Sequence, residues 1–463
     1  MTVISGFFSA VFWGVVLLSS LVFVHEAGHF LSARAFGMRV TEFFLGMPCR
    51  FRLSRTSATR GTEYGVTPIL LGGYTRICGM EEPDCPRLSD VLAYVAKEGR
   101  CTVSDLADGL SMPPADVDDC LYTLVDWAAI EPYWDERLGE TRKETRWPST
   151  FQTVRRDADL LTAFDRGHDF SKPGSTDAGQ AHPLPEGGAD ALLAQERSHT
   201  YVGKGFVARF VTLFSGPLVN LVLGLALIVG SLMATGVTVA NNVPTIGSVQ
   251  DGSLAQAAGL QAGDAITAID GEEVSTWVDM GSLLQGKLSE GNPVELSCDR
   301  AGSALTVSVG PIAEGAEAKI GIMPTTSQYH PDLLTATRGA WRYVTMTAEY
   351  VARLLQPAHT AEVVSQSSSV VGISVVASQA ARSGPSDFVF LMAAVSLSLG
   401  LMNLLPIPPL DGGKILIELV QLVSRRRVPA RVQNGLSYVG LALFLALFFV
   451  VLRQDVVRFV LGG

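Results

Sequence analysis

Four long apolar stretches constrain this chain more than any other feature of its sequence. Each approaches the roughly 20 residues that a membrane-spanning helix needs, and they occupy residues 7–24, 206–233, 388–405 and 436–452. Composition agrees, because 48% of the residues are hydrophobic and only 17% are charged, whereas soluble domains carry about 25% charged residues. The sequence therefore predicts a multi-pass α-helical membrane protein with four spans and soluble parts between them.

Basic residues predict the orientation of these spans. Arginines follow the first span, Lys204 and Arg209 precede the second, and residues 425–427 lie between the third and fourth. Lysine and arginine are enriched in cytoplasmic loops. We expect the N-terminus outside, residues 34–205 inside, 237–386 outside, 406–435 inside and the C-terminus outside. The first span lacks a basic leader and a small-residue cleavage site, so it is expected to be retained.

Charge is concentrated in one block of the chain. The net charge is −10, and residues 81–200 contain 24 acidic and 12 basic side chains. We interpret this block as a separate, solvated unit. No nucleic acid partner is expected, because phosphate binding needs a basic face.

The cysteines predict no disulfide scaffold. None of the six forms a CxxC pair, and five precede residue 121. We expect reduced thiols on the cytoplasmic side and a lone buried thiol at Cys298. A metal pair of Cys78 and Cys85 is the alternative to two unrelated thiols in a loop.

The sequence HEAGH at residues 25–29 predicts a metal site at the end of the first span. Positions i and i+4 share a helical face, so His25 and His29 can reach one zinc ion. Glu26 is adjacent and can take a proton from water as a general base. The alternative is two core histidines on an amphipathic helix, but ionisable groups at membrane depth are costly and usually functional.

Zinc needs a third protein ligand and a fourth position for water. The third span ends in NLLPIPPLDGG at residues 403–413. The prolines cannot continue a helix, so the backbone is expected to unwind near Asp411. Taken alone, Asp411 could form an Asx turn. Because the predicted topology brings it to the depth of His25 and His29, we interpret it as the third ligand.

These motifs resemble the site-2 protease family of intramembrane metalloproteases, and most closely its bacterial group that carries a PDZ domain and cleaves anti-sigma factors. TEFFLG at 41–46, TEYGV at 62–66 and LGGY at 71–74 resemble that group's membrane-associated β-hairpin. SGPLVN at 215–220 resembles its second-span motif, and SVVGI at 369–373 the segment before its third span, although the family commonly has proline at Val370. The resemblance covers residues 1–80 and 200–463.

The resemblance implies further site residues and a substrate class. Asn403 matches a residue that contacts substrate or the oxyanion, and Asn220 matches one beside the active site. The hairpin at Gly72, Gly73 and Tyr74 would pair with an unwound substrate by strand addition. The implied substrate is a single-span membrane protein, such as an anti-sigma factor or a signal-peptide remnant. It would be cut in the lipid bilayer of a bacterial inner membrane, after another protease has trimmed it.

Residues 237–311 predict a small outer domain that resembles a PDZ domain. We expect a short helix near residues 253–260, a strand at 262–271, a helix at 274–288 and two strands over 294–309. Such a domain could bind an extended C-terminus or act as a steric gate against bulky substrates. The following region, 312–386, is expected to hold an amphipathic helix before the third span.

Residues 81–135 form an acidic insert that resembles a winged-helix module. Helices are expected at 88–96, from 102 and at 115–124, with a strand near 128–133. DNA binding needs a basic recognition helix, but the third of these helices carries Asp116, Asp118 and Asp119. A cytoplasmic protein partner at residues 87–135 is therefore favoured. Residues 136–199 are expected to be a partly mobile linker.

These motifs and segments together predict a zinc intramembrane protease. Two alternatives are a non-catalytic membrane adaptor, which binds peptides through the PDZ-like domain and partners through the insert, and a membrane-tethered transcription regulator. The expected parts are a first helix (1–36), a hairpin region (37–80), the insert (81–135), a linker (136–199), a second span (200–236), the outer domain (237–311), an amphipathic region (312–386), a third span with its loop (387–435) and a fourth span (436–463).

Overall fold

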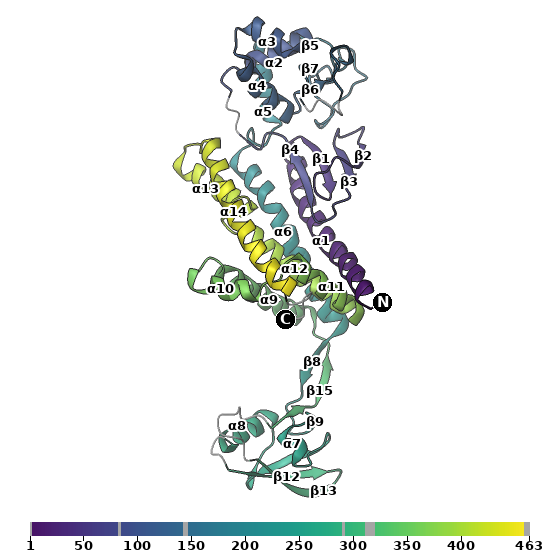
Figure 1. Cartoon of the computed structure of the whole chain (residues 1–463), viewed down its shortest axis with the longest axis vertical. Helices are drawn as coiled ribbons and strands as arrows, with labels where there is room; N and C mark the ends of the chain where they lie inside the picture. The colour runs from purple at the N-terminus through teal and green to yellow at the C-terminus, as the bar shows by residue number, and fades with distance from the viewer. Residues whose placement is uncertain (1, 82–84, 142–146, 289–291, 311–319, 458–463) are drawn as a thin grey trace. The chain divides into compact units, whose positions relative to one another are not determined.

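Among the residues that the structure describes, four helices are long and apolar enough to cross a membrane (Figure 1). This is a computed structural model, and it describes residues 2–81, 85–141, 147–288, 292–310 and 320–457. The four helices coincide with the predicted spans and are α1 (Thr2–Ala35), α6 (Phe206–Thr235), α12 (Pro385–Asn403) and α14 (Ala430–Asp455). The chain forms two compact units, Met1–Ile228 with Ala340–Gly463, and Val229–Gly339.

Small residues let the helices of the first unit approach one another closely. A Cβ atom added at Gly28 of α1 would lie 2.6 Å from the carbonyl oxygen of Ser215 on α6, and one added at Gly400 of α12 would lie 2.9 Å from that of Pro217. Ser396 Oγ donates a hydrogen bond to the Asn220 carbonyl at 2.8 Å. Close backbone approach with polar contacts is typical of helix packing in membranes. Helix α6 is thereby joined to both α1 and α12.

A four-stranded mixed sheet follows α1, where the sequence predicted a hairpin. Strand β1 is parallel to β3 and antiparallel to β4, and the order is β2-β3-β1-β4. The difference arises because β1 pairs along both of its edges. Strand β4 is an edge strand, so one of its edges has no strand partner in the described residues. The strands are β1 (Val40–Leu45), β2 (Leu53–Thr56), β3 (Glu63–Val66) and β4 (Gly73–Ile77).

From here on, the insert means the predicted insert and linker together, residues 81–199, and its described residues form a packed α/β domain. Its three-stranded sheet has the order β5-β7-β6. A capping box between Thr102 and Asp105 starts α3. Buried apolar side chains such as Leu106, Leu121 and Phe151 fill the core. The elements are α2 (Leu88–Glu98), β5 (Arg100–Thr102), α3 (Val103–Leu110), α4 (Pro114–Asp126), β6 (Ile130–Tyr133), η1 (Glu136–Leu138), β7 (Thr150–Thr153) and α5 (Gly188–Ser198).

The predicted linker at 136–199 contributes a strand, a helix and a buried ion cluster to this domain. The guanidinium of Arg39 donates to Asp165 at 2.7 and 2.6 Å and also to Glu196, and Arg156 donates to Glu196 at 2.6 Å. Each of these four side chains is at most 1% exposed. Polar composition predicted a solvated segment, whereas these charged side chains are buried. Their burial is tolerated because each charge is paired with an opposite one.

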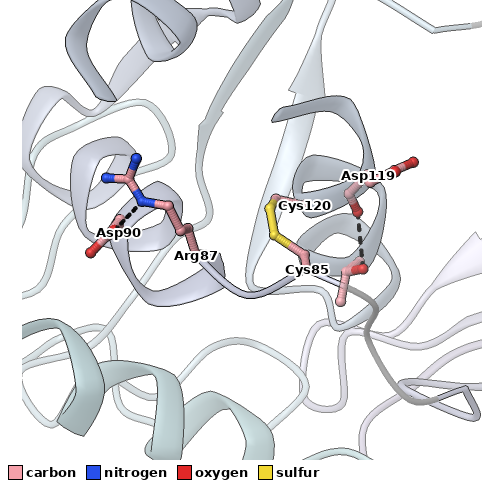
Figure 2. Close-up of a disulfide and its surroundings, with 6 residues drawn as sticks. Cys85, Arg87, Asp90, Asp119 and Cys120 are labelled. Carbon is pink, nitrogen blue, oxygen red and sulfur yellow. Dashed lines mark hydrogen bonds and ion pairs between the residues drawn. A yellow bond between two sulfur atoms is a disulfide. The ribbon is translucent and has the colours of Figure 1, made fainter. Parts of the chain in front are cut away.

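A disulfide joins Cys85 to Cys120 (Figure 2), which corrects the expectation of reduced thiols in this region. It also excludes Cys85 as a metal ligand together with Cys78, which is a free, buried thiol. The bond links the segment before α2 to α4 across 35 residues, with the two Cα atoms 5.6 Å apart. Sequence spacing could not reveal it, because only the packing of α4 brings the two together. Cys298 is a free, buried thiol, as predicted.

The second unit contains the helices and strands predicted for the outer domain. Strand β10 lies between β11 and β12 in a sheet of order β11-β10-β12-β13. Asp264 is buried and paired with Arg300 at 2.6 Å. The elements are β8 (Val237–Ala240), β9 (Ile246–Val249), α7 (Leu254–Ala257), β10 (Ala265–Ile269), β11 (Glu272–Glu273), α8 (Trp277–Leu288), β12 (Val294–Arg300), β13 (Ser303–Val309), β14 (Ile322–Pro324) and β15 (Thr326–Tyr329).

The remaining helices come before and after the third span in the chain. An amphipathic helix was predicted before that span, and three helices occur there, of which α11 packs along α1. Leu17, Leu21 and Ala377 are fully buried in that contact. The helices are α9 (Leu333–Arg353), α10 (Pro357–Gln366), α11 (Val370–Ser383) and, after the third span, α13 (Asp411–Ser424).

Candidate metal centre

The structure brings His25, His29 and Asp411 together. His25 Nε2 lies 3.2 Å from His29 Nε2, and Asp411 Oδ2 lies 3.1 Å from the first nitrogen and 3.3 Å from the second. Both histidines are buried, and Asp411 is half-buried. Three donor atoms from two distant segments thus form a nearly equilateral triangle.

Local sequence explains how Asp411 reaches the histidines. Helix α12 ends at Asn403, the proline-containing segment 404–410 is irregular, and α13 begins at Asp411 itself. The two glycines that follow are required, because a Cβ at Gly412 would lie 2.3 Å from the Leu404 carbonyl oxygen and one at Gly413 2.3 Å from the Pro408 nitrogen. The LDGG motif therefore allows α13 to fold back tightly against the segment that precedes it.

Helix α6 orients both histidine rings. The carbonyl oxygen of Thr212 lies 2.7 Å from His29 Nδ1 and accepts its proton, so the lone pair of His29 is on Nε2. A Cβ atom at Gly216 would lie 2.3 Å from His29 Nε2, so only glycine fits there. Asn220 is fully buried beside His25, with Nδ2 3.3 Å from His25 Nδ1.

The side-chain amide of Asn220 can face His25 Nδ1 with either its nitrogen or its oxygen. Its Oδ1 is buried and has no hydrogen-bond partner among the described residues. Rotating the amide by 180° exchanges oxygen and nitrogen. Oδ1 then accepts the proton of His25 Nδ1, which leaves a lone pair on Nε2 as in His29.

These donors fit a zinc ion. Two imidazole lone pairs and a carboxylate oxygen converging on one point repel each other unless a cation lies between them. Zinc binds nitrogen and oxygen at about 2.0–2.2 Å, which places neighbouring ligands of a tetrahedron about 3.3–3.5 Å apart. The observed separations of 3.1, 3.2 and 3.3 Å are close to these values. Three protein ligands also leave the fourth position open, as in catalytic zinc sites.

The free edge strand β4 lies beside Glu26. Thr75 Oγ1 donates a hydrogen bond to the Glu26 carbonyl at 3.2 Å. A Cβ atom added at Gly73 would lie 3.3 Å from Glu26 Cγ and 3.0 Å from the Phe44 carbonyl oxygen. Tyr74 stacks on Phe44, with ring centroids 5.2 Å apart. The glycine thus brings this strand close to the carboxylate side chain.

The structure does not join Asn403 or Gly72 to the triangle. Asn403 is the last residue of α12, half-buried, and its side chain makes no hydrogen bond in the described part of the chain. Gly72 accepts a hydrogen bond from the Gly46 amide at 2.7 Å. Thr212 was missed by sequence reasoning, because it acts through a backbone carbonyl that no side-chain pattern reveals.

Comparisons with known proteins identify the family of this chain. The model of peptidase family M50 matches residues 13–447. The zinc metalloprotease RasP of Shouchella clausii is 28% identical over 96% of this chain and 97% of its own length, and RasP of Geobacillus kaustophilus is 27% identical over the same shares. The regulator of sigma-W protease RasP of Bacillus subtilis is 25% identical, again over 96% and 97%. The family resemblance and the zinc cofactor predicted from the sequence are thereby confirmed. The chain belongs to peptidase family M50, the site-2 protease family, and is a zinc metalloprotease.

Proposed function

We propose that this protease cuts single-span membrane proteins within or at the inner edge of the bilayer. His25, His29 and Asp411 hold the zinc ion, and Glu26 is the general base. The observation that carries the proposal is the triangle of donors at the ends of spanning helices, with Glu26 and a free strand edge beside it.

Each residue near the triangle has a role in peptide hydrolysis. Zinc, when bound, supplies the Lewis acidity that polarises a carbonyl and acidifies water. Glu26 takes the proton of the attacking water and then passes it to the leaving amine. Thr212 and Asn220 hold the two imidazoles with their Nε2 lone pairs toward the ion.

Strand β4 is proposed to present the substrate. A peptide bond in a transmembrane helix is hydrogen-bonded and sterically covered, so it must be extended before water can attack it. The free edge of β4 can supply the backbone partners that unwinding removes. Gly73 and Tyr74 would then lie next to the scissile segment.

The positive-inside rule supports an N-terminus outside and the insert inside the cell. The relative from Bacillus subtilis supports the plasma membrane of a bacterium as the location. The name of the Bacillus subtilis relative supports a membrane-anchored anti-sigma factor as one substrate class. The order helix, strand, helix, helix and two strands in the insert is that of a winged helix. Its acidic α4 favours a protein partner over DNA.

The second unit is proposed to be a PDZ-like domain. A groove of about 420 Å³ lies between α8 and β14, lined by residues that include Trp277, Met280, Leu284 and Ile322. An extended peptide could add there as a strand. The alternative role of this PDZ-like domain is to exclude substrates that keep a bulky outer domain.

The test is cleavage of a single-span substrate with a short outer stub by purified, zinc-loaded protein in detergent. Wild type should cut it, and Glu26→Gln should lose at least 100-fold in rate while it keeps its zinc. Glu273→Gln, which changes an exposed carboxylate in the second unit, is the matched control. Peptide binding without cleavage by wild type on several substrates would favour the adaptor alternative.

A further inference from the structure

Helix α13 carries one buried carboxylate besides its metal ligand. Glu418 is 6% exposed, and its Oε1 accepts a hydrogen bond from the Tyr201 hydroxyl at 3.1 Å. Its Oε2 lies 3.1 Å from Arg209 Nη2 and forms an ion pair. The zinc site described above uses none of these three side chains.

Glu418 projects from the same face of α13 as Asp411. The two are seven residues apart, which is close to two full helical turns and about 10 Å along the axis. Much of the rest of the helix is exposed, from 39% for Leu419 to 84% for Val423. Packing of the described residues therefore holds α13 mainly along the side that carries Asp411 and Glu418.

One turn of helix α6 carries the groups that contact both Glu418 and His29. Arg209, which pairs with Glu418, lies three residues before Thr212, whose carbonyl accepts the proton of His29. A single rigid turn thus fixes a histidine ligand on α1 and, through Glu418, the helix that begins with the carboxylate ligand.

Tyr201, which lies just after the insert, adds a second anchor. It is 3% exposed, and its amide donates to the Cys78 carbonyl at 2.9 Å, just after β4. The amide of Val202 donates to the Gly79 carbonyl at 3.1 Å. The backbone around Tyr201 is therefore fixed by hydrogen bonds, so the Tyr201 hydroxyl can hold the Glu418 carboxylate in one position.

Stability does not explain why a carboxylate is buried here. Removing two charges from water costs about as much as their attraction returns, and apolar residues of similar volume are often neutral or better. Burial raises the pKa of the Glu418 carboxyl, which is a sign of that cost. Buried ion pairs are better suited to fixing one arrangement among several.

We propose that Glu418 is a positioning residue for Asp411, and that Arg209 and Tyr201 hold it in place. The contact fixes the rotation and height of α13, so that the Asp411 carboxylate stays over the histidine pair before zinc arrives. This inference rests on the proposed function, because it takes Asp411 as a zinc ligand.

The experiment measures zinc affinity of the full chain in detergent by competition with a chelating dye. Glu418→Ala should bind zinc about tenfold more weakly, at the low end of the 10–100-fold loss found for groups that orient metal ligands. Glu418→Gln keeps an acceptor for Tyr201 and should recover part of the loss. Tyr201→Phe should lose less than Glu418→Ala. Gln421→Ala, a polar truncation one turn along α13, should bind as wild type does.

A second readout separates positioning from a general loss of structure. Cobalt(II) bound in place of zinc has an absorption spectrum that reports ligand geometry, and Glu418→Ala should change that spectrum even when fully loaded. If Glu418→Ala does not fold, Glu418→Gln and Tyr201→Phe carry the test. Wild-type affinity and an unchanged cobalt spectrum in these variants would overturn the proposal, whatever happens to activity. If His25→Ala binds zinc as tightly as wild type, the proposed site itself fails, and this inference with it.

Discussion

Replacing Arg39 with leucine should destabilise the insert by about 3 kcal/mol or more. Arg39 follows α1 and is 1% exposed. Its guanidinium donates to both oxygens of Asp165 at 2.7 and 2.6 Å, to Glu196, and to the Trp127 carbonyl at 3.2 Å. The substitution removes the ion-pair partner of the buried Asp165 carboxylate, whose Oδ1 then keeps His199 Nδ1 at 3.1 Å, and it leaves Glu196 paired with Arg156 alone.

The magnitude follows from two independent arguments. Breaking a buried ion pair by removing one partner costs about 3–5 kcal/mol, because a charge stays buried without compensation. Burial by itself would raise the pKa of Asp165, yet its hydrogen bonds and charge interaction with Arg39 lower it from 3.8 to about 2. A lowering of that size corresponds to about 2 kcal/mol of folding free energy at neutral pH. The loss of the Glu196 and Trp127 contacts adds to it.

The assay is amide hydrogen exchange of the full chain in detergent, read by mass spectrometry over α2, α4 and β7. A loss of 3 kcal/mol should speed exchange of their slowest amides by about 150-fold. The matched control is Arg155→Leu, because Arg155 is 54% exposed and its ion pair with Asp177, at 3.2 Å, is exposed as well. Exposed pairs contribute about 0–1 kcal/mol, so this control should exchange almost as wild type does.

A double variant tests the reasoning behind the number. The cost is expected to come from the uncompensated charge of Asp165. The amides of the double variant Arg39→Leu/Asp165→Leu, which lacks that charge, should therefore exchange more slowly than those of Arg39→Leu alone. The reasoning is refuted if Arg39→Leu matches Arg155→Leu, or if the double variant loses the full sum of the two single variants.

Three further outcomes are expected. Gly73→Val should cut substrate cleavage at least tenfold while zinc affinity stays unchanged, because its Cβ would lie 3.0 Å from the Phe44 carbonyl oxygen and 3.3 Å from Glu26 Cγ; equal cleavage would argue against a role for β4. Cys85→Ser should make the insert about 3–4 kcal/mol less stable than the oxidised wild type, because the bond closes a loop across 35 residues; equal exchange of α4 amides in the two would contradict this. The contribution of Asp165, whose pKa is lowered, is present above about pH 4 and should be lost as pH falls toward about 2; exchange profiles of the wild-type insert with no acid-sensitive step of this kind would contradict it.

Local patterns in the sequence predicted the spans and the residues of the metal triangle. The hydropathy of about 20 consecutive residues is enough to identify a spanning helix. The spacing of His25 and His29 brings them together in any α-helix, whatever the rest of the fold. Asp411 was found because the predicted topology brought two motifs to one depth. The parallel pairing of β1 with β3, the disulfide and the charge cluster around Arg39 were not found. Each depends on segments that meet only after the chain has folded.

Two arginines show why residues that position other groups could not be predicted from the sequence. Arg39, one of the arginines that follow the first span, and Arg209 were interpreted as charges that set the orientation, yet each pairs with a buried carboxylate. An arginine near the membrane interface satisfies both descriptions, and its sequence context does not separate them. The orientation stays a prediction, and it depends more on arginines with exposed side chains, which are Arg50, Arg55, Arg60, Arg425, Arg426 and Arg427. Arg39, which is buried, and Arg209, which is partly exposed, instead connect α1 to the insert and α6 to α13 through their ion pairs with Asp165 and Glu418.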